Sequence, residues 1–133
     1  MSIFKAYDIR GIYGTELTQD DFYKIARGYA QFCGFTGRNS KVVVARDCRK
    51  SSDALFAAFS KGLVDEGVDV IDIGLASTPM SYFANAKLGA DGSVMITASH
   101  NTKEWNGNRK ISFILFVCFA KMMYFCSRKL QKE

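Results

Sequence analysis

The amino-acid sequence predicts an α/β fold of three layers (α/β/α), in which a mostly parallel or mixed sheet lies between helices. Short runs of β-branched and other apolar residues, at 41–45, 68–73 and 94–96, are typical of strands that are buried on both faces. Stretches with helical periodicity separate these runs, and such alternation indicates a layered α/β protein. The chain has 133 residues, 48% of them hydrophobic, which suffices for one domain with a packed core.

The first helix is expected over residues 18–33, after a strand at 4–9. Thr18 is a suitable N-cap, and the acidic pair at 20 and 21 lies in the first turn, where the helix dipole favours negative charge. Gly34 supplies a C-terminal stop. The apolar residues at helical spacing are Phe22, Ile25, Ala26, Tyr29 and Cys33.

Two further helices are expected. The second covers about residues 52–66 and ends at Gly67, and the third follows Pro79. The apolar face of the second helix consists of Leu55, Phe56, Phe59, Gly62 and Leu63. The apolar residues of the third, weaker helix are Tyr82, Phe83, Ala86 and Leu88.

The last quarter of the chain differs in composition from the rest. Residues 1–102 hold 11 Lys/Arg and 11 Asp/Glu, whereas residues 103–133 hold 7 and 2, so the net charge of +5 lies entirely in the second part. The balanced body argues against a nucleic-acid-binding domain. The apolar stretch 111–126 is short and contains Lys121, which argues against a membrane span. We expect one domain over residues 1–107, and an atypical apolar and basic tail over 108–133 outside its fold.

The cysteines and the single histidine exclude some site types. The four cysteines form no CxxC pair, and a lone His100 rules out a zinc cluster built on several histidines. The first residues lack the apolar segment of a secretory signal. We therefore expect a cytoplasmic protein with free thiols.

Ser99 is the leading candidate for chemistry. Ligands of parallel sheets bind at the carboxyl ends of strands, and Ser99 follows the strand expected at 94–96. A serine hydroxyl there can accept a phosphoryl group or act as an activated nucleophile. His100 beside it can bond a phosphate or move a proton near neutral pH. On residue types alone, a Ser-His-Asn turn bonded to its own backbone is the more frequent alternative.

Two basic segments could bind an anion. Arg10, beside Gly11, can clamp a phosphate with its guanidinium, or can be a surface arginine at a turn. Residues 46–52 follow a strand and lead into a helix N-terminus, which suits an anion site as well as it suits an N-cap with solvated charges. Arg46 and Arg49 are the residues we place in a phosphate environment.

The order of these segments resembles the N-terminal domain of the α-D-phosphohexomutases, the phosphomannomutase/phosphoglucomutase family. The resemblance covers about residues 3–107. The segments that carry it are FKAYDIRG at 4–11, ARDCRKSS at 45–52, STP at 77–79, TASHN at 97–101 and WNG at 105–107. The serine loop and the opening segment, in this order and spacing, are specific to the family.

The resemblance implies an activity and a set of roles. Family members interconvert hexose 1-phosphate and hexose 6-phosphate through a phosphoserine and a bisphosphorylated sugar. By this likeness Ser99 is the phosphoserine, and its phosphate is also a ligand of Mg²⁺. His100 would lie beside the reacting sugar oxygens, and Arg10 and Tyr7 would hold the phosphoserine and the hexose phosphate. Asn101 would also bind substrate.

The sequence departs from the family in two ways. Counted from Ser99, Arg109 occupies the place of a family lysine, and Lys110 does so with a shift of one residue; both are expected to bind substrate, although arginine is a poor acid or base. The family enzyme also has three further domains, one with an Asp-rich Mg²⁺ loop. The sequence thus predicts a truncated phosphohexomutase that is inactive alone, with a tail that is frameshifted or read through. The alternative is a non-catalytic module, either one that binds sugar phosphates or a regulatory one.

Overall fold

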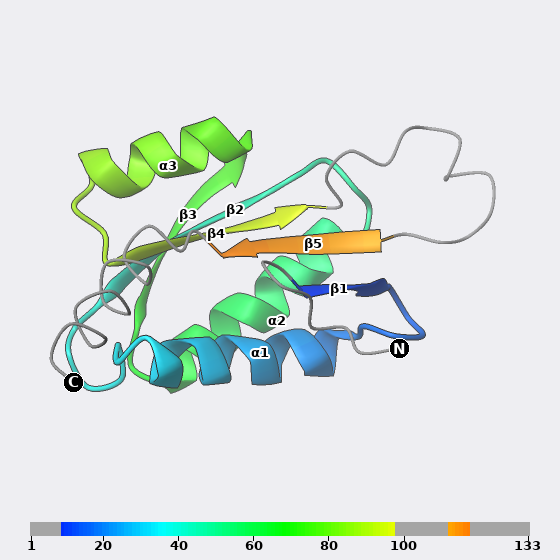
Figure 1. Cartoon of the computed structure of the whole chain (residues 1–133), viewed down its shortest axis with the longest axis horizontal. Helices are drawn as coiled ribbons and strands as arrows, with labels where there is room; N and C mark the ends of the chain where they lie inside the picture. The colour runs from blue at the N-terminus through cyan, green and yellow to red at the C-terminus, as the bar shows by residue number, and fades with distance from the viewer. Residues whose placement is uncertain (1–8, 98–111, 118–133) are drawn as a thin grey trace, which may run out of the picture.

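The computed structural model describes residues 9–97 and 112–117, which form helices on both faces of a five-stranded sheet (Figure 1). The expected three-layer α/β/α fold is confirmed. In chain order the elements are β1 (Ile9–Ile12), α1 (Gln19–Phe32), β2 (Lys41–Arg46), α2 (Ser52–Asp65), β3 (Asp69–Leu75), α3 (Thr78–Lys87), β4 (Gly92–Thr97) and β5 (Ser112–Val117).

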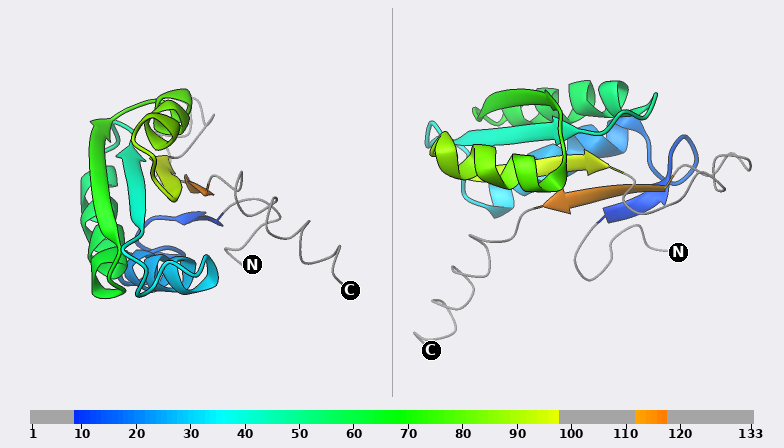
Figure 2. Two further views of the ribbon diagram at one scale, coloured as in Figure 1. Left: turned by 90° about the vertical axis from the view of Figure 1, so that its left-hand side faces the viewer. Right: turned by 90° about the horizontal axis from the view of Figure 1, so that it is seen from above.

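The sheet is mixed, with the strand order β1-β5-β4-β2-β3. Strands β2, β3 and β4 are parallel, as expected for strands joined by crossover helices. Strand β5 runs antiparallel to both β4 and β1. Helices α1 and α2 lie on one face of the sheet and α3 on the other, as the views in Figure 2 show.

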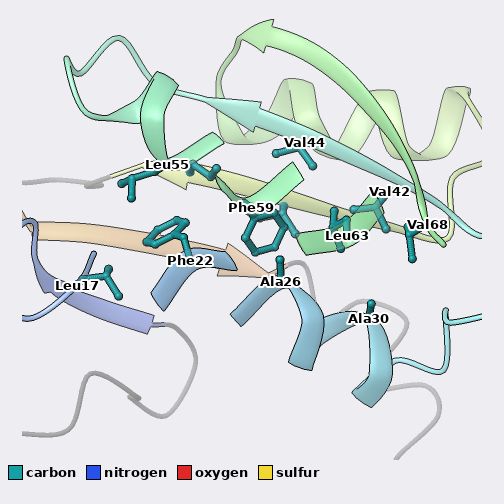
Figure 3. Packing of buried hydrophobic residues seen from close by; sticks show 12 residues of the cluster. Leu17, Phe22, Ala26, Ala30, Val42, Val44, Leu55, Phe59, Leu63 and Val68 are labelled. Atoms are coloured by element: carbon teal, nitrogen blue, oxygen red, sulfur yellow. The ribbon is translucent and has the colours of Figure 1, made fainter. Parts of the chain in front are cut away.

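The main core lies between the sheet and helices α1 and α2 (Figure 3). Phe59 of α2 is fully buried and makes an edge contact with Phe22 of α1, with ring centroids 6.3 Å apart. Val42 and Val44 of β2 close this core from the sheet side. Both helices bury the faces expected from their periodicity, because apolar residues three and four apart share one side of a helix.

Local signals set the helix ends. Thr18 forms a capping box with Asp21: the Asp21 amide donates to Thr18 Oγ1, and the Thr18 amide donates to a carboxylate oxygen of Asp21 at 2.8 Å. Gly34 and Gly67 follow α1 and α2 with φ of 67° and 77°, a left-handed conformation that glycine adopts without strain. The expected helix boundaries are therefore confirmed to within one residue.

Helix α3 corrects the sequence analysis. Its expected start is confirmed, since Ser77 caps it and Pro79 lies in its first turn. Its large apolar residues, however, do not face the core: Tyr82 and Phe83 are exposed, whereas Ser81 is buried. Small side chains on the sheet side let α3 approach β2 and β4 closely, which covers Val43 and Met95. Apolar character alone was therefore a wrong guide to the buried side of this helix.

Two expectations concern the ends of the predicted domain. The strand expected at residues 4–9 lies outside the described residues except for Ile9, and the described strand β1 covers Ile9–Ile12. Strand β5 lies beyond the boundary expected at residue 107, so part of the segment 108–133 belongs to the sheet. Backbone pairing with β1 and β4 defines it, and this pairing leaves little trace in side-chain periodicity.

Candidate functional site

The carboxyl ends of the three parallel strands meet at one edge of the sheet. The backbone amide of Asp47, just after β2, donates to the carbonyl of Ile96 in β4 at 3.0 Å. The amide of Ala76, just after β3, donates to the carbonyl of Arg46 at 3.2 Å. The chain that leaves β4 after Thr97 therefore starts beside the loop 46–52. This is the edge at which α/β sheets bind ligands.

Strand β5 brings Arg10 to the same edge. Arg10 of β1 pairs with Ile114 of β5, and Ile114 also pairs with Thr97 of β4, so the three residues form one row across the sheet. Neighbouring strands are about 4.8 Å apart, which puts the backbones of Arg10 and Thr97 about 10 Å from each other. Ser99 is two residues beyond Thr97 in the sequence. The sheet thus brings the segment that contains Arg10 near Thr97, the first residue of the segment 97–101 that contains Ser99.

Arg46 is held tightly where β2 ends. Its Nε donates to Asp53 at 2.6 Å, its Nη1 donates to Asp72 at 2.8 Å, and its guanidinium carbon lies 4.3 Å from the centre of the Phe56 ring. Its side chain is only 18% exposed. Two carboxylates therefore offset its positive charge, and the aromatic ring fixes its plane.

Asp47 organises the loop between β2 and α2. One carboxylate oxygen accepts from the Ser52 hydroxyl at 2.5 Å and from the Arg49 amide at 3.2 Å. The other oxygen accepts from Arg49 Nε at 3.2 Å. Together with the bond from its own amide to Ile96, these contacts tie the start of α2 to the end of β4. These contacts hold the loop in place beside the end of β4.

The start of α2 carries an unusual cap. Ser51 has helical backbone angles, its side chain makes no capping bond, and its buried hydroxyl has no hydrogen-bond partner. The role of an N-cap side chain is to bond a free backbone amide. The arginines of residues 46–52 pair with carboxylates of this chain rather than with water alone, and the anion site at this loop stays a prediction.

Not every residue expected at the site can be placed. Arg46 and Arg49 lie at the expected edge, where they pair with carboxylates of this chain; their role toward phosphate stays a prediction. For Arg10 the structure places the backbone. The other expected residues lie outside the described residues: Tyr7, Ser99, His100, Asn101, Arg109 and Lys110.

Metal binding and membrane crossing can be assessed for the described residues. Within residues 9–97 and 112–117, no three His, Cys, Asp or Glu side chains group closely enough to hold a metal ion. None of the described helices combines the length and the apolar character that a membrane crossing needs.

Sequence reasoning missed the partners of Arg46. Asp72 interrupts the apolar run Val70-Ile71-Asp72-Ile73, and an acidic residue within a predicted strand was the available signal. Asp53 and Phe56 lie one helical turn apart at the start of α2. Their approach to Arg46 depends on how α2 crosses the sheet, which local sequence does not encode.

Comparisons with known proteins point to one family. Residues 1–118 match the family model described as phosphoglucomutase/phosphomannomutase, alpha/beta/alpha domain I. A phosphomannomutase of Klebsiella pneumoniae is 45% identical over 111 residues, which are 84% of this chain and 68% of the relative. A phosphomannomutase of Escherichia coli is also 45% identical over 111 residues, but these are only 24% of its length.

Solved structures agree with the sequence comparison. A phosphoglucomutase/phosphomannomutase family protein from Burkholderia thailandensis superimposes with a TM-score of 0.70 and 37% identity, over 85% of this chain and 25% of that protein. A structure from Thermus thermophilus, described as a phosphomannomutase, gives a TM-score of 0.73 and 30% identity, over 86% of this chain and 24% of that one. The chain therefore spans about a quarter of the length of these solved structures and of the Escherichia coli relative.

Proposed function

This chain belongs to the phosphoglucomutase/phosphomannomutase family, and from that membership we propose that it is the serine-bearing domain of a phosphohexomutase. In this proposal Ser99 accepts and returns a phosphoryl group during the interconversion of hexose 1-phosphate and hexose 6-phosphate. The 118 matched residues include the serine segment TASHN at 97–101.

One structural observation supports the proposal most directly. The chain leaves β4 at Thr97, in one row with Arg10 and beside the Asp47 loop, at the edge where sheets of this kind bind ligands. Phosphoryl transfer depends mainly on positioning and on neutralising charge, rather than on covalent chemistry by many residues. A strand end that lies one strand away from Arg10, and beside the Asp47 loop, suits that need.

The proposed transfer step can be written with its bonds. The Ser99 oxygen forms a bond to the phosphorus of a bisphosphorylated hexose, and the bond from that phosphorus to the sugar oxygen breaks. The proton of the serine hydroxyl passes to the sugar oxygen, with His100 as the relay. In the return step the sugar hydroxyl gives its proton back as it takes the phosphoryl group. Tyr7, Arg10 and Asn101 would hold the sugar phosphate in place.

Magnesium belongs to the proposal as a ligand of the phosphorylated serine. When bound, Mg²⁺ would neutralise charge on the phosphoryl group. The described residues offer no group of three acidic, His or Cys side chains, and Mg²⁺ favours carboxylate and phosphate oxygens. Phosphorylated Ser99 alone is a weak site, so we expect the remaining ligands to come from the part of the relatives that this chain does not span.

Intact-mass spectrometry tests whether Ser99 carries phosphate. The purified chain is incubated with a hexose 1,6-bisphosphate and Mg²⁺, and we expect the gain of one phosphoryl group, mapped by peptide analysis to Ser99. Ser99→Ala should gain none, whereas Ser51→Ala, which changes the buried and unpaired hydroxyl, should be phosphorylated as the natural chain is. Equal phosphorylation of Ser99→Ala and the natural chain would exclude the proposed role.

A second measurement concerns turnover. Because the chain spans about a quarter of most of these relatives, we propose that it does not complete the mutase cycle alone. A coupled assay with glucose 1-phosphate or mannose 1-phosphate, Mg²⁺ and a bisphosphate activator should show no Ser99-dependent activity. Ser99-dependent turnover would contradict this part of the proposal.

The same short coverage favours one alternative, a non-catalytic module that binds sugar phosphates. Calorimetry separates the two functions. Binding of glucose 1-phosphate that is unchanged in Ser99→Ala, together with no phosphoryl transfer, would favour the module. We further propose that the protein works in the cytoplasm, where hexose phosphates and Mg²⁺ are available and thiols stay reduced.

A further inference from the structure

The chain engages Arg46 and Arg49, the two arginines predicted in a phosphate environment, in different ways. Arg46 donates through Nε to Asp53 of α2 and through Nη1 to Asp72 of β3. Its guanidinium carbon also lies 4.3 Å from the centre of the Phe56 ring. Two carboxylates thus share its positive charge, and the ring covers one side of the guanidinium. These contacts fit a residue that holds β2, β3 and α2 together.

The guanidinium of Arg49 keeps more of its donors. Its Nε donates to Asp47 at 3.2 Å, and its side chain is 23% exposed. Within residues 9–97 and 112–117, its two terminal nitrogens, Nη1 and Nη2, have no hydrogen-bond partner. These nitrogens form the planar fork that can bind two oxygens of one phosphate group. Arg49 is therefore oriented by the chain and retains the donors that phosphate recognition needs.

Asp47 fixes the direction of the Arg49 guanidinium. Besides Arg49 Nε, its carboxylate accepts from the Ser52 hydroxyl at 2.5 Å and from the Arg49 amide at 3.2 Å. Ser52 is fully buried, and the Asp47 amide donates to the carbonyl of Ile96 at 3.0 Å. These bonds hold Arg49 beside the end of β4, and Ser99 follows Ile96 by three residues in the sequence. A side chain that is held before its ligand arrives loses less conformational entropy on binding.

We propose that Arg49, oriented by Asp47, binds a phosphate monoester at this edge of the sheet, whereas Arg46 holds the edge in shape. The monoester belongs either to the hexose phosphate or to phosphorylated Ser99, which offer the same phosphate oxygens. Asp47 is a positioning residue in this proposal, because it acts through Arg49. The inference rests on the proposed function, since that function brings both sources of phosphate to this edge.

Calorimetry tests the hexose phosphate as the source. Glucose 1,6-bisphosphate is titrated into the Ser99→Ala chain, which has no serine at this position to phosphorylate. A further Arg49→Gln change should raise the Kd about tenfold or more, because charge-assisted hydrogen bonds are lost. Lys50→Gln is the matched control: it removes the same charge from an exposed residue of the same loop, and should change the Kd by less than about twofold.

Phosphorus NMR tests phosphorylated Ser99 as the source. A bound arginine lowers the pKa of a phosphate, so Arg49→Gln should raise the pKa of the phosphoserine and Lys50→Gln should leave it unchanged. An effect of Arg49→Gln in this measurement alone identifies phosphorylated Ser99 as the ligand. Absence of an effect in both measurements overturns the proposal. If Ser99 is never phosphorylated, the proposed function fails, and calorimetry alone decides the present inference.

A double-mutant cycle tests the positioning role of Asp47. Asp47→Ala should weaken phosphate binding when Arg49 is present, and should add little to Arg49→Gln, because it acts through that side chain. Additive effects would overturn this role. Thermal unfolding tests the division between the arginines: Arg46→Gln should lower the midpoint more than Arg49→Gln does, because it leaves two carboxylates without their shared partner. The opposite order would contradict the assignment.

Discussion

The two faces of the sheet are covered in different ways. On one face, α1 and α2 pack aromatic and aliphatic side chains against Val42 and Val44, and their surfaces carry ion pairs. On the other face, α3 covers Val43 and Met95 with small side chains and turns Met80 and Phe83 outward. Apolar burial is therefore concentrated on the first face.

Residues of the same type consequently have different roles in the two layers. Phe59 and Phe83 are both helical phenylalanines, yet the first is fully buried and the second is 70% exposed. Stability measurements can separate the two roles, since burial of apolar surface is the main favourable term in folding.

Truncation of one ring on each face should separate the two layers most clearly. Phe59→Ala should lower the free energy of unfolding by about 3–5 kcal/mol, because it removes a buried ring and leaves a cavity. Phe83→Ala should change it by less than about 0.5 kcal/mol. Urea unfolding followed by circular dichroism measures both. Equal losses would mean that α3 contributes to the core as much as α2 does.

A second test uses the close approach of α1 and α2. A Cβ added at Gly62 would lie 2.5 Å from the carbonyl oxygen of Tyr23 and 2.8 Å from the Cβ of Ala26. Gly62→Ala should therefore cost about 1–3 kcal/mol of stability, despite the better helix propensity of alanine. Gly28→Ala is the control within α1: no atom lies within 4 Å of its added Cβ, and it should stabilise by about 0.5–1 kcal/mol. If both variants are more stable than the natural chain, α1 and α2 can move apart at little cost to accept the methyl group added at residue 62.

Glu66 gives a pH-dependent test of the α1–α2 face. It accepts from Arg27 Nε at 2.7 Å, and from Gln31 and Thr36, while its side chain is only 6% exposed. The Arg27 guanidinium holds the pKa of Glu66 below its ordinary value of 4.5. A lowered pKa stabilises the folded state above that ordinary value, and the contribution is lost as the pH falls through the lowered pKa.

Glu66→Gln should accordingly lower the urea midpoint at pH 7, and its difference from the natural chain should shrink below about pH 4.5. Asp20→Asn, which breaks an exposed pair with Lys24, should leave the midpoint nearly unchanged at both pH values. Urea titrations at several pH values measure these differences. A gap between Glu66→Gln and the natural chain that stays constant down to about pH 3 would contradict the assignment.

The smallest effects concern the helix caps. Thr18→Ala removes the capping box of α1 and should cost about 1 kcal/mol. Ser77→Ala removes a single 3.4 Å bond from the Met80 amide at the start of α3, and should cost about 0.5 kcal/mol. Thermal unfolding resolves the pair. If Ser77→Ala loses more stability than Thr18→Ala, the cap of α3 contributes more than the cap of α1, contrary to this prediction.

Much of the fold could be predicted from local sequence. The apolar spacing of Phe22 and Ala26 fixed the buried side of α1, and Gly34 and Gly67 marked helix ends. The same method failed for α3, because Tyr82 and Phe83 lie on its exposed side. Periodicity indicates which side of a helix is apolar, and it does not indicate which surface that side will contact.

For the candidate site, too, local sequence predicted one part and the tertiary structure decided the rest. The position of Ser99 after a buried strand, and of Arg46 at the end of another, followed from the sequence, because strand ends and the loops after them are local features. Only the tertiary structure decided that β5 lies between β1 and β4, that Arg10 shares a row with Thr97, and that Asp72 reaches Arg46. Strand order and ion pairing join segments far apart in the chain, and they depend on the geometry of backbone pairing and helix packing rather than on any local pattern of residues.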